Sequence, residues 1–193
     1  MEKACNSEDN HKKIVILKDK DGICISRTAE EEYNIKFKIT QLLHMPSFID
    51  FNIFQLIIDL NKDIFESSSI DINNNNNEAN ITVNFQPILN DLGIQGSNRC
   101  LLVKKIQSEY LGEIDKTIFH ITSIVNENEE NVNELHYESV IECTFLTNNS
   151  VSIIITKNIR NELVLPFIEM LGVNISGKII SRVKQFIEEM INI

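Results

Sequence analysis

Four residues with the chemistry of zinc ligands lie on predicted strands of this chain. If three neighbouring strands pair, the cysteines and histidines could converge into a tetrahedral Cys2His2 set, formed by Cys100, His120, His136 and Cys143. Structural zinc sites normally carry closely spaced ligand pairs, and this sequence has none. We therefore interpret the four as unrelated residues and expect no metal and no cofactor.

The residues needed for catalysis do not form a recognisable motif. The sequence has no G-x-S-x-G turn, no H-E-x-x-H helix and no P-loop. The carboxylate pairs Glu129-Glu130 and Glu188-Glu189 fall in a polar loop and on the wet face of a predicted helix, where water prevents a raised pKa. The sequence therefore predicts that the protein is not an enzyme. One alternative stays open: an active site assembled only in three dimensions around His120, His136 or Cys143.

A glycine-containing turn offers a second alternative. Gly93-Ile94-Gln95-Gly96 is followed by the helix-like segment Lys104-Lys105-Ile106-Gln107-Ser108-Glu109 and by Leu111-Gly112. This arrangement resembles the G-x-x-G loop and second helix of a KH RNA-binding domain. The resemblance implies that the Gly93–Gly96 loop would clamp single-stranded nucleotides. RNA binding is therefore kept as an alternative function.

The charge of the chain is strongly negative and unevenly placed. The protein has 193 residues with 18 basic and 28 acidic side chains, a net charge of −10. Residues 41–159 carry 6 of the basic and 16 of the acidic side chains, so this middle part holds the whole excess. The negative electrostatic potential around this middle part repels nucleic-acid phosphates and anionic membranes. It argues against a nucleic-acid partner and is compatible with a basic protein partner.

The sequence also lacks the marks of export and of membrane insertion. No apolar run approaches the roughly 18–20 residues that cross a bilayer, and we expect the polar segment at the start not to act as a signal peptide. The four cysteines are widely separated, which is typical of free thiols in a reducing compartment. We expect a cytoplasmic protein with no membrane contact, with the nucleus as the alternative.

We expect a single domain over residues 1–193. In the first two thirds of it, residue patterns predict several strands and two loops. Two β-branched runs flank Asp19-Lys20-Asp21-Gly22, which predicts a hairpin. Alternation predicts strands over 35–39, 81–85 and 116–125. The Ser- and Asn-rich segment 66–80 and the acidic segment 126–134 are predicted to be loops. Residues 46–65 and 99–111 fit either helix or strand, with helix favoured in the second half of 46–65.

The last third has the clearest patterns. Alternation from Tyr137 to Phe145, the Asn148-Asn149 turn and the run from Val151 to Thr156 predict a second hairpin. A helix beginning near Ser176 carries one apolar stripe, and Gly172 and Gly177 separate it from a shorter segment. The fold class expected is α+β: an antiparallel sheet of about five to seven strands with the C-terminal amphipathic helix packed on it.

The strand after the second turn is apolar on both faces. This pattern indicates either a central strand or a partner surface, and we favour the central strand. If a partner binds here, the interaction candidates are Val151, Ile153, Ile154 and Ile155.

The C-terminal pattern resembles a family of small chaperones. Val140-Ile141-Glu142-Cys143-Thr144-Phe145, the 151–156 strand and the closing helix look like proteasome assembly chaperone 3. The resemblance implies a non-enzymatic protein that pairs with a partner chaperone and docks on proteasome α-subunits. The function expected is therefore a protein–protein interaction module acting as an assembly chaperone. Its oligomeric state is open and compatible with a dimer.

Overall fold

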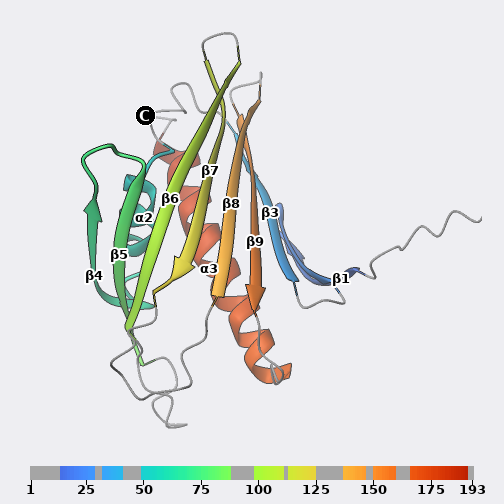
Figure 1. The fold of residues 1–193 in the computed structure, drawn as a ribbon. Helices are drawn as coiled ribbons and strands as arrows, with labels where there is room; N and C mark the ends of the chain where they lie inside the picture. Colours follow the sequence, from blue (N-terminus) through green and yellow to red (C-terminus); the bar gives the residue numbers. More distant parts are fainter. Residues whose placement is uncertain are drawn as a thin grey trace, which may run out of the picture.

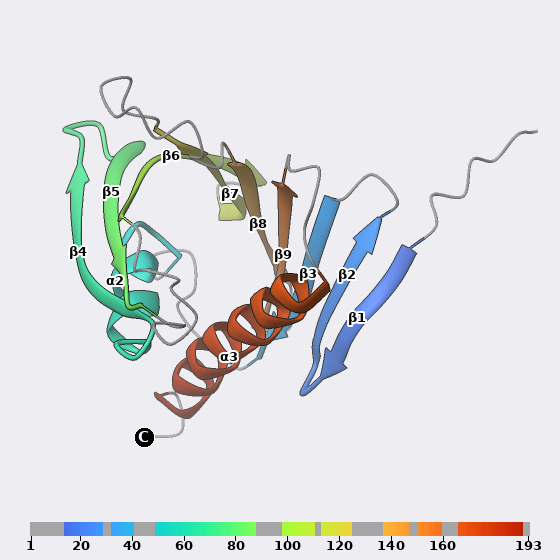
Figure 2. The same ribbon diagram turned by 90° about the horizontal axis from the view of Figure 1, so that it is seen from below.

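A strongly curved antiparallel sheet wraps around one long helix (Figures 1 and 2). The computed structural model describes residues 14–28, 32–40, 49–87, 98–110, 113–124, 137–146, 150–159 and 166–190. The nine strands in these ranges form one sheet in the order β1-β2-β3-β9-β8-β7-β6-β5-β4. The strands are β1 (Ile14–Lys20), β2 (Ile23–Thr28), β3 (Glu32–Ile39), β4 (Phe65–Ile72), β5 (Glu78–Phe85), β6 (Asn98–Tyr110), β7 (Glu113–Ser123), β8 (Tyr137–Leu146) and β9 (Ser150–Ile159). Helix α3 (Pro166–Met190) lies across the concave face, and α2 (Asn52–Asp59) lies beside β4 and β5.

Turn chemistry explains the hairpin at the start of the sheet. Asp21 and Gly22 have φ angles of 55° and 72°, and β1 pairs with β2 from Lys20↔Ile23 outward. Two consecutive positive φ angles are what a tight two-residue hairpin requires, and Asp-Gly supplies them at low cost. The hairpin predicted at this place is confirmed.

The second predicted hairpin is also confirmed, and it places β9 at the centre of the sheet. β8 and β9 pair from Leu146↔Ser150 to Tyr137↔Ile159, and residues 147–149 lie outside the described part. β9 pairs on its other edge with β3, so the last strand joins the N-terminal strands to the rest of the sheet. This is the central-strand arrangement that its two apolar faces favoured.

The expectation of five to seven strands is too low, because two segments are strands that their residue patterns do not reveal. Residues 99–111 fall mostly in β6, which pairs with β5 on one edge and β7 on the other. The loop predicted over 66–80 is instead the β4–β5 hairpin, and only residues 73–77 form its turn. In that turn Asn73 Oδ1 accepts hydrogen bonds from the backbone N–H groups of Asn77 and Glu78. Backbone pairing thus holds a polar segment that buries little.

The break predicted between Gly172 and Gly177 is wrong, because α3 continues through both glycines. Its buried face includes Val173, Ile180, Val183 and Ile187, all packed towards the sheet. Burial of such a face stabilises a helix far more than the roughly 1 kcal/mol that each internal glycine costs.

Other predictions have mixed outcomes. Within residues 46–65 the helix α2 covers residues 52–59. The Gly93–Gly96 loop, the acidic loop 126–134 and His136 lie outside the described residues. The assignment of residues 1–193 to a single domain stays a prediction. Among the residues that the structure describes, no helix is long and apolar enough to cross a membrane.

Candidate ligand-binding cavity

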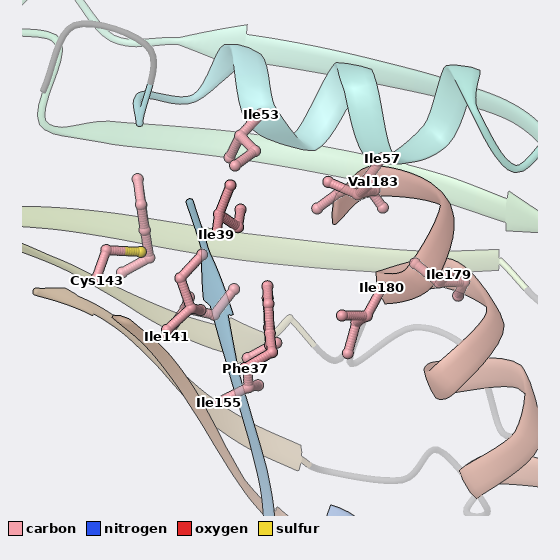
Figure 3. Close-up of a pocket in the computed structure, with 12 residues that line it drawn as sticks. Phe37, Ile39, Ile53, Ile57, Ile141, Cys143, Ile155, Ile179, Ile180 and Val183 are labelled. Carbon is pink, nitrogen blue, oxygen red and sulfur yellow. The ribbon is translucent and has the colours of Figure 1, made fainter. Parts of the chain in front are cut away.

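An apolar cavity lies between the concave face of the sheet and the two helices. It has two compartments, one of about 210 Å³ and one of about 60 Å³. The compartments share five lining residues, so they border one another: Ile57, Ile141, Ile155, Ile179 and Ile180. Figure 3 shows the lining of the smaller compartment, with side chains from the sheet, α2 and α3 pointing towards one another.

The register of β3, β9 and β8 determines which side chains form the floor of the cavity. Ile155 of β9 pairs with Ile35 of β3 on one side and with Ile141 of β8 on the other. One row further along, Ile153 pairs with Phe37 and Cys143 in the same way. Because directly paired residues project from the same face of a sheet, these six side chains form two adjacent rows under α3.

The spacing of aliphatic residues along α2 and α3 determines which side chains form the roof of the cavity. Ile53 and Ile57 are four residues apart on α2, and Ile179, Ile180 and Val183 lie on the inner face of α3. Residues three and four positions apart share one side of a helix. The two helices therefore close the space from above with branched aliphatic side chains (Figure 3).

The N-terminal part of α3 is fixed to the sheet by Glu169. Arg27 Nη1 lies 2.7 Å from Glu169 Oε1, and the Tyr33 hydroxyl donates to the same oxygen at 2.9 Å. Burial and the hydrogen bond to Glu169 raise the pKa of Tyr33, so its hydroxyl stays protonated as a donor.

The C-terminal half of α3 is fixed to the segment that follows α2. Lys178 Nζ and Arg182 both bind the Asp63 carboxylate, which holds the Asp63 pKa well below its usual range. Arg182 also donates to Oδ1 of the fully buried Asn61 at 3.1 Å. Together with Glu169, these contacts hold the roof of the cavity at both ends.

Polar groups gather in the larger compartment, at the row beyond Ile155. Lys157 of β9 pairs with Tyr33 of β3 and with Ser139 of β8. Lys157, Ser139 and Ser176 of α3 all line this compartment, whereas the smaller compartment has an apolar lining. The cavity is therefore amphipathic, with one polar end.

The titratable groups on the lining do not form an acid–base pair. Burial raises the pKa of the Cys143 thiol to about 12, so this sulfur is protonated and a poor nucleophile near neutral pH. Loss of hydration lowers the pKa of Lys157. We find no partner base for either among the described lining residues.

The three described residues that were considered as zinc ligands, Cys100, His120 and Cys143, are not brought together. Cys143 lines the cavity, whereas His120 is exposed on the opposite face, in register with Lys104 and Val140. Cys100 contacts the Thr82 hydroxyl at 3.8 Å. In the described ranges, no three His, Cys, Asp or Glu residues are grouped closely enough to hold a metal ion.

The interaction candidates occupy three different environments. Val151 and Ile153 are buried in the core, Ile155 lines both compartments, and Ile154 points to the outer face between Lys36 and Glu142. A role for them in partner binding stays a prediction. Sequence patterns did not single out the polar lining residues Lys157, Ser139 and Ser176 as site residues, although one signal was present for Lys157. It continues the inward series Ile153, Ile155, Lys157, where an apolar residue is expected.

Several solved structures share this fold. The human StarD13 (DLC2) lipid transfer and protein localization domain superposes with a TM-score of 0.65 at 9% identity, over 90% of this chain and 88% of that one. Human StAR-related lipid transfer protein 5 gives 0.58 at 10% identity, over 96% and 88%. Human STARD10 gives 0.60 at 9% identity, over 90% and 72%. No protein-family model matches the sequence, and no curated protein matches it.

These neighbours correct the sequence-based interpretation. The resemblance to proteasome assembly chaperone 3 is wrong. The hairpin and the closing helix that suggested it are parts of a larger fold, in which a curved sheet wraps around a helix as in the three human structures above. The assembly-chaperone function, the protein partner and the KH-like RNA-binding alternative are not supported by this fold. A hairpin followed by an amphipathic helix is a local pattern that many folds share, so it could not identify the family.

Proposed function

We propose that the protein is a non-enzymatic domain that binds one lipid-like molecule in the cavity beneath α3 and carries or presents it. The observation that supports this most is the apolar lining contributed by both helices and the centre of the sheet. Human structures of the same fold are described as lipid transfer domains, which supports the same ligand class.

The cavity supplies the driving force for such binding. Transfer of a methylene group from water to an apolar surrounding is favourable by about 0.8 kcal/mol, so even a short length of hydrocarbon contributes substantially. The larger compartment, about 210 Å³, is smaller than the roughly 300–1,000 Å³ typical of pockets for drug-sized ligands. This size favours a slender single-chain molecule over a bulky lipid with several chains.

Lipid extraction from vesicles tests the proposal. The purified chain is incubated with vesicles of mixed cellular lipids and re-isolated, and its bound lipid is identified by mass spectrometry. The key variant is Ile141→Phe, because Ile141 lines both compartments and a larger ring takes up space at their junction. We expect the native chain to carry lipid and the variant to carry at least about tenfold less, since lost burial of two methylene groups accounts for that factor.

A matched control adds the same ring to the other face of the sheet. Ile154 lies on the neighbouring strand and points outward, so Ile154→Phe should extract lipid like the native chain. Thermal unfolding of each variant confirms that it is folded. A native chain that returns from the vesicles without lipid would refute the proposed function.

A further inference from the structure

Lys157 is an unusual lining residue for an apolar cavity. It is half-buried and borders the larger compartment, with no hydrogen bond or ion pair to any described residue. Loss of hydration lowers its pKa, as expected of an ammonium group without a compensating negative charge. An unpaired charge in such a place costs free energy, and a bound anion would remove that cost.

Ser139 is a second unpartnered polar group at the same place. It is 4% exposed, and its hydroxyl is buried without a hydrogen-bond partner. Ser139 and Lys157 are directly paired across β8 and β9 and line the same compartment. Buried hydroxyl groups are normally hydrogen-bonded, so an unsatisfied hydroxyl beside an unpaired ammonium group indicates a missing acceptor.

The surrounding charges limit what that acceptor can be. The neighbouring cation Arg27 is already paired with Glu169 at 2.7 Å, and the Tyr33 hydroxyl donates to the same carboxylate. Lys157 is therefore the uncompensated charge among the described lining residues, although the whole chain carries −10. One ammonium and one hydroxyl group match a singly charged acceptor with two oxygens.

We propose that the cavity takes a long-chain carboxylate whose headgroup is bound by Lys157 and Ser139, with its hydrocarbon chain along the rows of Ile155 and Ile153. The inference rests on the proposed function and adds the charge and orientation of the ligand. The polar end of the larger compartment receives the carboxylate, and the smaller apolar compartment receives hydrocarbon. Hydrogen bonds between charged partners are about twice as strong as neutral ones, so the headgroup contributes to selectivity.

Titration with a fluorescent fatty acid and its uncharged ester tests the inference. The probes are cis-parinaric acid and its methyl ester, which share one hydrocarbon chain and differ in charge. We expect the native chain to bind the acid about tenfold more tightly than the ester. Lys157→Met should remove that preference by weakening acid binding alone, and Ser139→Ala should reduce it. Lys36→Met is the charge-matched control, because Lys36 is exposed on the outer face of β3, and it should leave both affinities unchanged.

Each other outcome has a definite meaning. Equal affinity of the native chain for acid and ester overturns the carboxylate inference and leaves lipid binding intact. Equal weakening of both probes by Lys157→Met also overturns it, because the lysine would then support the cavity rather than the headgroup. If the native chain binds neither probe, the carboxylate inference is overturned as well, and the lipid extraction from vesicles decides separately whether the proposed function fails. The comparison of acid with ester on the native chain needs no variant to fold.

Discussion

At the scale of single residues, Asp50 shows how this acidic chain uses a carboxylate for stability. Its Oδ1 accepts hydrogen bonds from Lys105 Nζ and from the backbone N–H of Phe51, both at 2.7 Å. Burial acts to raise the pKa of Asp50, but these hydrogen bonds and the charge of Lys105 outweigh it and lower the pKa below 3.8. Lys105 also lies over the Phe51 ring, 5.1 Å from its centroid. Asp50 thus joins β6 to the segment before α2.

We predict that Asp50→Asn lowers stability in a pH-dependent way. A carboxylate whose pKa is depressed by folding stabilises the folded state above its unfolded pKa, and this contribution is lost as pH falls through the folded value. The variant should cost about 1–3 kcal/mol at neutral pH and progressively less below about pH 4. Urea unfolding at both pH values measures the difference. Asp71→Asn, on an exposed position of β4, should have little effect, and an equal loss at both pH values would contradict the account.

Cys143 should be the slowest of the described cysteines to react with alkylating reagents. Its thiol is buried with a pKa of about 12, whereas Cys24 and Cys100 are only half-buried. Because the thiolate is the reactive form, alkylation of Cys143 in the folded chain should lag behind that of the other two. Peptide mapping by mass spectrometry measures all three rates, and denaturant should make them similar. Fast labelling of Cys143 in the folded chain would contradict its burial against the cavity.

At the scale of elements, turn chemistry and alternation predicted the structure where both were strong. Asp21-Gly22 and Asn148-Asn149 marked the two hairpins, and the alternation from Tyr137 to Phe145 indicated which side chains of that strand share a face. The segment of β4 was predicted to be a loop, and the segment of β6 was left open between helix and strand, because a polar edge strand and a strand with charged outward residues lack a clean apolar alternation. Their identity comes from backbone pairing with the neighbouring strands β5 and β7, which no apolar pattern within either segment reveals.

The cavity could not be predicted for a related reason. The floor of the cavity depends on which residues of β3, β8 and β9 pair with one another. β3 and β9 lie far apart in the chain, so no local residue pattern predicts the register between them. The apolar stripe along α3 indicated only that this side of the helix packs against another part of the protein. Lys157 was visible as one charged residue in an inward series, yet only the register places it beside Ser139.

The continuity of α3 yields a stability prediction. Gly172 is exposed within the helix, and an added Cβ would meet nothing within 4 Å. Gly172→Ala should therefore raise the free energy of unfolding by about 0.5–1 kcal/mol. At Gly177 a new Cβ would lie 2.5 Å from Lys18 Nζ, so Gly177→Ala should gain less because that side chain must move. Destabilisation by Gly172→Ala would show that the helix does not run through this position.

In the molecule as a whole, the sheet and α3 enclose a cavity instead of forming a completely packed core. Buried residues such as Phe119, Val103 and Ile81 pack the side towards β5, while Ile25 and Ile35 form a second cluster with Val173 and Ile180. The cavity lies where these two clusters meet under the helix, with residues of both on its lining. A ligand seated there would contact both clusters at once and should stabilise the folded chain by linkage.

A native mass spectrum of the purified chain after exposure to lipid vesicles shows whether the cavity beneath α3 binds lipid. Our account predicts one bound lipid per chain, retained by Ile154→Phe and lost from Ile141→Phe. A spectrum in which the native chain carries no lipid, or in which both variants carry the same amount as the native chain, would contradict binding in the cavity beneath α3.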